Sequence, residues 1–265
     1  MDETCVRRLD EADCEEMVRL LRQEPAYNLY FLGNLESLGF DDAICEWWGS
    51  FRDGRLVGVL MRYMSGWNVY DTPGTDLAAF GRIVDVHPAG AKRLQDNTHT
   101  APSLLPFLRR YRAARVTPHQ LCDLNAADFT PLPLKAFVRR AILTDLEALA
   151  AFYADAGKMT RSRRAIQRPL QAGRVFVAEV NGEIVSAALT NAETDDLAMI
   201  GGVYTPPSHR NRGYASSVMT ELCRSLLNDG KRPVLYYEDP AAATVYHRLG
   251  FRERGVWRSV WLEPG

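Results

Sequence analysis

Several short sequence patterns in the first half of this 265-residue chain recur in the same order in the second half. This repeat constrains the fold more than any other feature. Val6-Arg7-Arg8 recurs as Val138-Arg139-Arg140, and an aspartate follows at the same offset in each copy, Asp13 and Asp145. An apolar pattern with helical spacing comes after each aspartate. Each copy is therefore expected to begin with a strand followed by a helix.

A hairpin pattern is the second repeated element. FRDGRLVGVL at 51–60 resembles EVNGEIVSAAL at 179–189. Asp-Gly and Asn-Gly are strong two-residue turn signals, because both central positions of that turn need a positive φ. Each match alone carries little weight, but matches in the same order indicate a tandem duplication.

The boundary between the copies is expected near residue 130, in FTPLPLKAF, where two prolines suit a linker or an exchanged edge. We predict an α/β protein of two tandem domains, residues 1–130 and residues 131–265, each a mixed sheet flanked by helices. The copies differ farther on. After an expected strand at 83–86, the first copy continues with polar residues and lacks the glycine-bearing helix start of the second.

Composition excludes several classes of protein. A net charge of −1 gives no basic field, so binding to nucleic acid or to a membrane surface is not expected. No apolar run approaches the roughly 20 residues of a membrane span, and the charged N-terminus does not resemble a signal peptide, which favours a cytoplasmic protein. The scattered cysteines and histidines predict neither a disulfide framework nor a metal site.

The most informative local stretch lies in the second copy and reads SHRNRGYASSVMTEL, residues 208–222. It follows an expected strand at 197–205 and opens an expected amphipathic helix. The first N–H groups of a helix have no intrahelical partner, and the helix dipole makes that end positive. Gly213 allows close backbone approach, and Arg210 and Arg212 add donors suited to phosphate. Together these features predict a phosphate site at the start of the helix.

The glycine spacing narrows the choice of phosphate ligand. Neither GxxxxGK[ST] nor GxGxxG occurs, which disfavours a P-loop or a Rossmann site. The run Arg210-Asn211-Arg212-Gly213-Tyr214-Ala215 instead resembles the pyrophosphate loop of the GNAT acetyltransferase family, Arg/Gln-x-x-Gly-x-Gly/Ala, at every fixed position. Downstream, residues 239–251 resemble the family's Asn-x-x-Ala-x-x-x-Tyr-x-x-x-Gly-Phe signature. The resemblance covers about residues 135–265, and the repeat makes the first copy look like a degenerate GNAT domain.

The resemblance implies transfer of an acyl group, usually acetyl, from acetyl-CoA to an amine by direct attack in a ternary complex, without a metal. The pantetheine arm would lie beside the strand end formed by Val203, Tyr204 and Thr205, with Gly201-Gly202 easing a splay or bulge, or simply weakening the strand. The residues implied to hold the pyrophosphate are Arg210, Asn211, Arg212, Gly213, Tyr214, Ala215 and Ser216.

Two further positions follow from the second signature. Tyr246 matches the tyrosine that donates a proton to the leaving thiolate, although a core aromatic is the alternative. Asp239 stands where the family usually has Asn, so it either contacts the cofactor or, as we prefer, caps the following helix.

The general base is not evident from the sequence. The strand LAMIGGVYT carries no carboxylate, and a water relay is left open. The nearby acidic residues are interpreted as solvated strand-end or loop charges; they are Glu179, Glu193, Asp195, Asp196 and Glu238.

Two residue groups have competing interpretations. The basic run at 158–164, with Arg168 after it, is interpreted first as a solvated helix face, and otherwise as a contact for an acidic acceptor or partner. Trp47, Trp48 and Trp67 are interpreted first as core or domain-interface residues.

The sequence as a whole favours an N-acetyltransferase that acts on a primary amine of a small molecule or peptide, with acetyl-CoA as co-substrate. The alternatives are an acyltransferase using another acyl-CoA and a CoA-binding sensor without turnover. The first copy would then shape the acceptor pocket or a homodimer surface.

Overall fold

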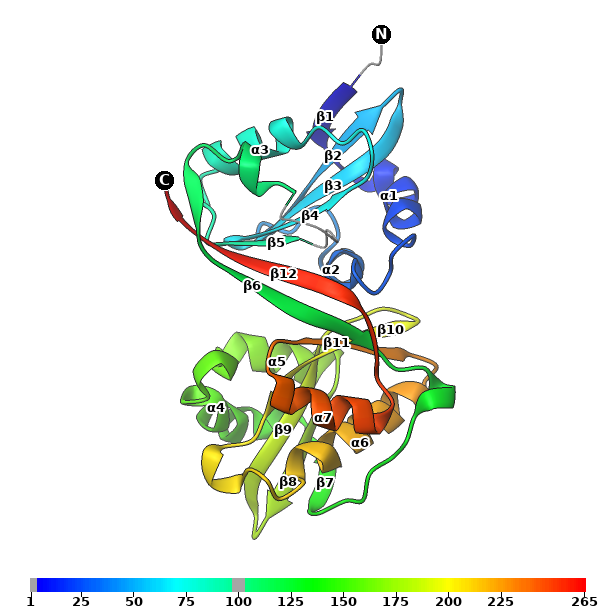
Figure 1. Ribbon diagram of the computed structural model, residues 1–265, viewed down its shortest axis with the longest axis vertical. Helices are drawn as coiled ribbons and strands as arrows, with labels where there is room; N and C mark the ends of the chain where they lie inside the picture. The colour runs from blue at the N-terminus through cyan, green and yellow to red at the C-terminus, as the bar shows by residue number, and fades with distance from the viewer. Residues whose placement is uncertain (1–3, 97–102) are drawn as a thin grey trace. The chain divides into compact units, whose positions relative to one another are not determined.

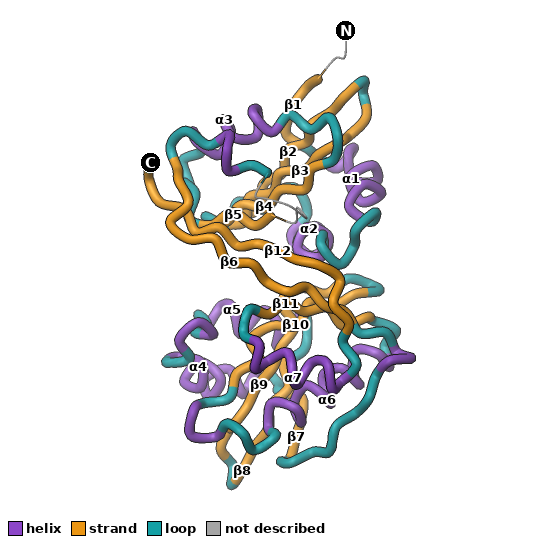
Figure 2. The backbone as a smooth tube through the Cα atoms, viewed as in Figure 1, coloured by secondary structure: helices purple, strands orange, loops and turns teal. Residues whose placement is uncertain are grey.

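The computed structural model describes residues 4–96 and 103–265. By internal contacts the chain divides into two compact units (Figures 1 and 2). The first unit is Met1–Leu121 together with Arg254–Gly265, and the second is Cys122–Glu253. The sequence predicts a boundary near residue 130, and this division by contacts groups Arg254–Gly265 with the first unit. No helix in the described part of the chain is long and apolar enough to span a membrane.

The first unit has the strand order β1-β2-β3-β4-β5-β12-β6. Trp47, Trp48 and Trp67 are buried in its core, as predicted. Its elements are β1 (Thr4–Arg8), α1 (Cys14–Leu21), α2 (Leu29–Leu38), β2 (Cys45–Arg52), β3 (Arg55–Tyr63), β4 (Gly66–Asp71), α3 (Leu77–Val86), β5 (Arg93–Asp96) and most of β6 (Tyr111–Asp123) and β12 (Arg252–Pro264).

One secondary-structure prediction in the first unit is wrong. Residues 83–86 form the last turn of α3 and not a strand. The Asp76 side chain accepts a hydrogen bond from the N–H of Ala79 at 2.8 Å and so caps the helix, while Phe80 and Val84 are buried at helical spacing. A short apolar run such as this one is compatible with a strand or a helix when the cap is not taken into account.

The second unit has the strand order β11-β10-β9-β8-β7, in which only β10 and β11 are parallel. The strands and helices predicted here are confirmed, and α6 ends at a left-handed glycine, Gly230, with φ +73°. Its elements are β7 (Phe137–Arg140), α4 (Leu146–Ala154), α5 (Arg163–Ala172), β8 (Val175–Val180), β9 (Glu183–Glu193), β10 (Leu197–Tyr204), α6 (Tyr214–Asn228), β11 (Arg232–Tyr237) and α7 (Pro240–Leu249).

The repeated sequence forms the same local structure in both units. Arg7 donates to both carboxylate oxygens of Asp13 at 2.7 and 2.6 Å, and Arg139 does the same to Asp145 at 2.8 and 2.9 Å. Each aspartate also accepts the N–H three residues before it, so it joins the strand end to the helix start. The guanidinium lowers the pKa of both carboxyl groups. The two hairpins match as well, with positive φ at Asp53-Gly54 and Asn181-Gly182.

Helices cover both faces of the second unit's sheet. One face packs on α6 and α7, through a cluster that includes Ile200, Val218, Leu222, Tyr246 and Leu249. The other face packs on α4 and α5, through a cluster that includes Leu149, Tyr153, Ile166, Val177 and Leu189. The alternation of side chains along the strands accounts for the two clusters.

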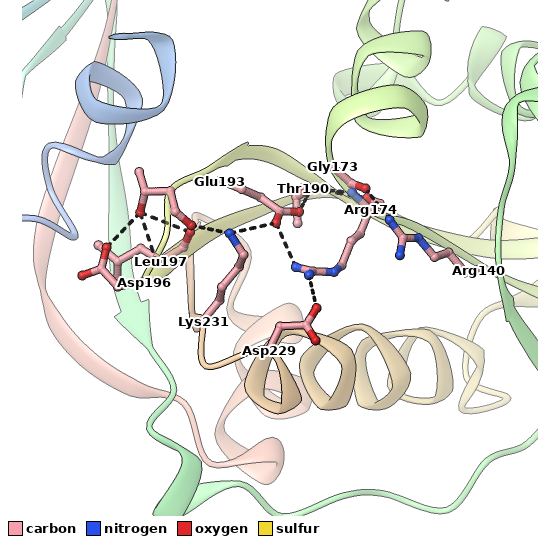
Figure 3. Close-up of polar contacts among 10 residues, drawn as sticks. Arg140, Gly173, Arg174, Thr190, Glu193, Asp196, Leu197, Asp229 and Lys231 are labelled. Atoms are coloured by element: carbon pink, nitrogen blue, oxygen red, sulfur yellow. Dashed lines mark hydrogen bonds and ion pairs between the residues drawn. The ribbon is translucent and has the colours of Figure 1, made fainter. Parts of the chain in front are cut away.

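A buried ionic network joins β8, β9 and the end of α6 (Figure 3). The Arg174 side chain is only 8% exposed, and it pairs with Glu193 at 2.8 Å and with Asp229. Lys231 also approaches Glu193, at 3.6 Å. Removing one partner of a buried ion pair leaves the other charge without compensation, so this network should matter for stability.

We predict that Glu193→Gln lowers the free energy of unfolding by about 3 kcal/mol, because it leaves the Arg174 and Lys231 charges without their shared carboxylate. Glu147→Gln is the matched control: its pair with Arg163 is 69% and 59% exposed, and its loss should change stability by less than about 1 kcal/mol. Urea unfolding of both variants measures the difference, and equal losses would contradict the assignment.

Candidate functional site

Strands β10 and β11 separate halfway along their length. They pair in parallel only from Leu197 with Arg232 to Met199 with Val234. Beyond this point β10 continues to Tyr204 and β11 to Tyr237 without pairing to each other. The backbone edges on either side of this gap therefore have polar groups available to an extended ligand.

A bulge in β10 lies beside the gap. Gly201 pairs with Leu189 and Tyr204 with Ala187, so Gly202 and Val203 together face a single residue of β9. Gly202 adopts a left-handed φ of +58°, which a side chain would strain. The buried Tyr153 hydroxyl donates to the Gly202 carbonyl at 2.5 Å and holds the bulge from the α4 side. The bulge that the glycine pair suggested is therefore present.

The loop between β10 and α6 presents backbone N–H groups at the helix start. Asn211 and Gly213 both have left-handed φ, +61° and +81°, and Gly213 is the N-cap of α6 without a side-chain capping bond. The first-turn N–H groups therefore have no side chain competing for them. Arg210 donates from Nε to the Thr205 carbonyl at 3.1 Å, and Arg212 is exposed. This is the geometry of an anion site at a helix N-terminus.

The helix of the first unit that corresponds to α6 is α3, and the start of α3 is not available to an anion. There the Asp76 carboxylate caps α3 and occupies the N–H of Ala79. A carboxylate at this position both uses a donor and repels a phosphate. The prediction that only the second copy has this loop agrees with the contrast between Asp76 and Gly213.

Lys135 is a residue of the site that the sequence did not reveal. Its Cγ lies 2.8 Å from the position that a Cβ would occupy on Gly213. The backbone N–H of Lys135 donates to Ser217 Oγ at 2.8 Å, and that hydroxyl donates to the Gly213 carbonyl at 3.0 Å. The segment before β7 thus places a further cation beside the loop. No local pattern indicates this contact, because its partners are far apart in the chain.

Tyr246 lies on α7, in the core cluster on the α6 face. It is 7% exposed, and its ring contacts those of Tyr237 and Phe251 at 5.7 and 5.9 Å between centroids. Burial raises the pKa of its phenol above the ordinary value. Burial of Tyr246 therefore favours the protonated form of its phenol.

The acidic residues near the site are mostly held by partners. Asp239 caps α7 by accepting from the N–H of Ala241 at 2.9 Å, as we preferred. Glu179 pairs with Arg139, and Glu238 pairs with Lys158. Glu193 belongs to the Arg174 network and Asp196 accepts from the Thr194 hydroxyl, so these two are not simply solvated charges.

The basic run at 158–164 is not one solvated helix face. Arg163 pairs with Glu147 on the surface, and Lys158 reaches Glu238 at the end of β11. Arg161 instead turns inward, and its Nε is buried beside Gly202. The interpretation as a solvated face is therefore wrong for Arg161, because its side chain lies against Gly202 of β10.

Val203 and Tyr204 lie on opposite faces of β10. Val203 packs against the α6 cluster, and Tyr204 packs against the α4 cluster, 5.4 Å from the Phe152 ring. The Thr205 hydroxyl bonds to Ser186 at 2.9 Å. In residues 4–96 and 103–265, no cluster of three or more histidine, cysteine or acidic side chains could hold a metal.

Comparisons with known proteins agree with this fold. Residues 180–262 match the family model of FR47-like protein. The chain is similar in structure to a GCN5-related N-acetyltransferase from Sphaerobacter thermophilus, with 17% identity over 98% of this chain and 95% of that one and a TM-score of 0.65. It is also similar to an acetyltransferase of the GNAT family from Colwellia psychrerythraea, with 14% identity over 98% and 100% of the two chains and a TM-score of 0.60.

A tandem GNAT protein from the clavulanic acid biosynthesis pathway is similar as well. It is 14% identical over 99% of this chain and 98% of that one, with a TM-score of 0.62. No curated protein matches the sequence. The chain has the fold of the GNAT acetyltransferases. The fold implied by the resemblance at residues 210–215 and 239–251 is confirmed.

We predict that Gly213→Glu weakens coenzyme A binding about 100-fold or more, because it sets a carboxylate and a side chain against the anion site. Gly230→Glu is the matched control, since Gly230 ends the same helix with a similar φ of +73° and nothing within 4 Å of an added Cβ. Both variants carry the same left-handed strain. Calorimetric titration with coenzyme A should separate them, and an unchanged affinity in the Gly213 variant would contradict the placement.

Proposed function

We propose that the second unit binds acetyl-CoA and transfers its acetyl group to a primary amine of a small molecule or peptide. The observation that carries this proposal is the uncapped start of α6 beside the gap between β10 and β11. An anion site and an adjoining strand edge fit a ligand with a pyrophosphate and an extended, amide-containing arm.

In this proposal the pyrophosphate lies on the N–H groups of residues 210–216. Arg210, Arg212 and Lys135 add positive charge around it. The pantetheine arm lies along Val203–Thr205, where β10 no longer pairs with β11. Its thioester then lies near the bulge at Gly202, and the two reactants meet in the gap.

The reaction is a direct substitution at the thioester carbonyl. The neutral amine nitrogen forms the new C–N bond and the C–S bond breaks, so the thiolate of coenzyme A leaves with the electron pair. The amine loses one proton and the thiolate gains one. Holding both reactants in one gap supplies several kcal/mol of the barrier lowering.

Tyr246 is the proposed donor of the proton to the thiolate. A phenol whose pKa is raised by burial keeps its proton at neutral pH and can transfer it to a leaving group. Strand β10 carries no carboxylate, so we propose that the amine proton leaves through water. In this reading Glu238, which is paired with Lys158, is not the base.

We predict that Tyr246→Phe lowers turnover about 100-fold while changing coenzyme A affinity little, because a general acid contributes 10²–10⁴-fold and little to binding. Tyr237→Phe is the control: its neighbouring hydroxyl donates to Glu253 at 2.8 Å, and its loss should leave turnover within about threefold. Thiol release and calorimetry measure the two quantities. Equal turnover in wild type and the Tyr246 variant would remove Tyr246 from the chemistry.

The rival function of a CoA-binding sensor makes a different prediction for the unmodified protein. Such a protein would bind coenzyme A tightly and release no thiol from acetyl-CoA with any amine. A panel of acyl-CoA donors in the same assay distinguishes acetyl from other acyl groups.

A further inference from the structure

Arg161 occupies an unusual place at the bulge of β10. Its Nε, Cζ and Nη2 atoms lie 2.7, 3.1 and 3.1 Å from the position that a Cβ would occupy on Gly202. The guanidinium thus rests directly on the Gly202 backbone, in space that any other residue at 202 would fill. It also lies close enough to Tyr153 to act on that phenol through its charge.

The position of Arg161 is set by its surroundings. It follows the 3-10 turn Gly157–Met159 and precedes Ser162, whose side chain caps α5 by accepting from the N–H of Ala165 at 3.3 Å. One turn along α5, Ile166 is fully buried against the sheet. These contacts hold both ends of the short segment that carries Arg161.

Among the residues that the structure describes, Arg161 has no anionic partner. Its Nε is buried without a hydrogen bond, and within the described ranges no carboxylate pairs with its guanidinium. Its neighbours in the basic run differ, since Lys158 pairs with Glu238 and Arg163 with Glu147. Arg161 is partly buried, and its buried Nε–H without an acceptor costs free energy that a bound anion would recover.

The face of the sheet on which Arg161 lies indicates which ligand it meets. The start of α6 and Tyr246 belong to the face that packs on α6 and α7. Tyr153 and Tyr204 belong to the other face, and Arg161 lies with them. If the acyl donor enters along α6, the amine must approach the thioester from the side of Arg161.

We propose that Arg161 binds a carboxylate carried by the acceptor, so that the substrate is an amine with a carboxylate in the same molecule. The planar guanidinium offers paired donors that match a carboxylate, and its fixed place beside the bulge would set the distance from amine to thioester. This inference rests on the proposed function and names its substrate class.

The test compares amino acids with their amides, which keep the size and remove the negative charge. L-Alanine, β-alanine and 4-aminobutyrate are each assayed against the corresponding amide, in wild type, Arg161→Gln and Arg163→Gln. For at least one spacing, wild type should prefer the carboxylate in kcat/KM. That preference should fall about 30-fold in Arg161→Gln and stay unchanged in Arg163→Gln.

Four results would overturn the proposal. Wild type could show no preference for any carboxylate, or the preference could survive in Arg161→Gln. Arg161→Gln could also lower kcat/KM equally for carboxylates and amides. That result would indicate that the guanidinium contacts the thioester and not the acceptor. A preference for aminomethylphosphonate over every carboxylate would likewise contradict the carboxylate assignment.

A binding measurement separates this inference from the proposed function. The same carboxylates and amides are titrated calorimetrically into the protein saturated with coenzyme A. If no amine releases thiol but carboxylates bind through Arg161, the acetyltransferase proposal fails and the proposed carboxylate site at Arg161 stands. If amides turn over and no carboxylate binds, the acetyltransferase proposal stands and this inference fails. If neither turnover nor binding occurs, both fail.

Discussion

The separation of β10 from β11 after Met199 is the constraint on which the candidate site depends. Pairing along the full strands would close the sheet and leave no edge for a ligand. The bulge at Gly202 turns the end of β10 away, and the Tyr153 hydroxyl holds that carbonyl in place. On one side of the gap lies the uncapped start of α6, and Arg161 lies on the other face. In the function that we propose, the gap gives two ligands access to one point.

The two units differ in the residue that begins the corresponding helix. In the first unit Asp76 caps α3 with its own carboxylate. In the second unit the N-cap is Gly213, which has no side chain to compete for the N–H groups. The strand–aspartate–helix corner, by contrast, is kept in both units through Arg7 with Asp13 and Arg139 with Asp145.

Sequence reasoning identified the features that have a local physical signature. The repeated arginine and aspartate, the hairpin turns, and the glycine that starts α6 depend on residues close together in the chain. The strand expected at 83–86 failed for the same reason, because a short apolar run is ambiguous and the deciding cap lies earlier at Asp76. Local patterns therefore predicted the strands and helices of the second unit, but in the first unit they predicted a strand where α3 ends.

The parts that sequence reasoning missed are contacts between distant segments. Lys135 reaches Gly213, and Arg161 lies on Gly202, and nothing near either basic residue indicates its partner. Arg161 also belongs to a charged run that is most simply interpreted as solvent-exposed, and only the packing of α5 turns it inward.

Amide hydrogen exchange with and without coenzyme A tests the central claim most directly, namely that the gap and the start of α6 in the second unit form the ligand site. Bound coenzyme A should slow exchange at residues 210–216 and at the end of β10, residues 200–205. It should leave the first turn of α3, residues 77–80, unchanged. Protection of 77–80, or none at 210–216, would contradict the account.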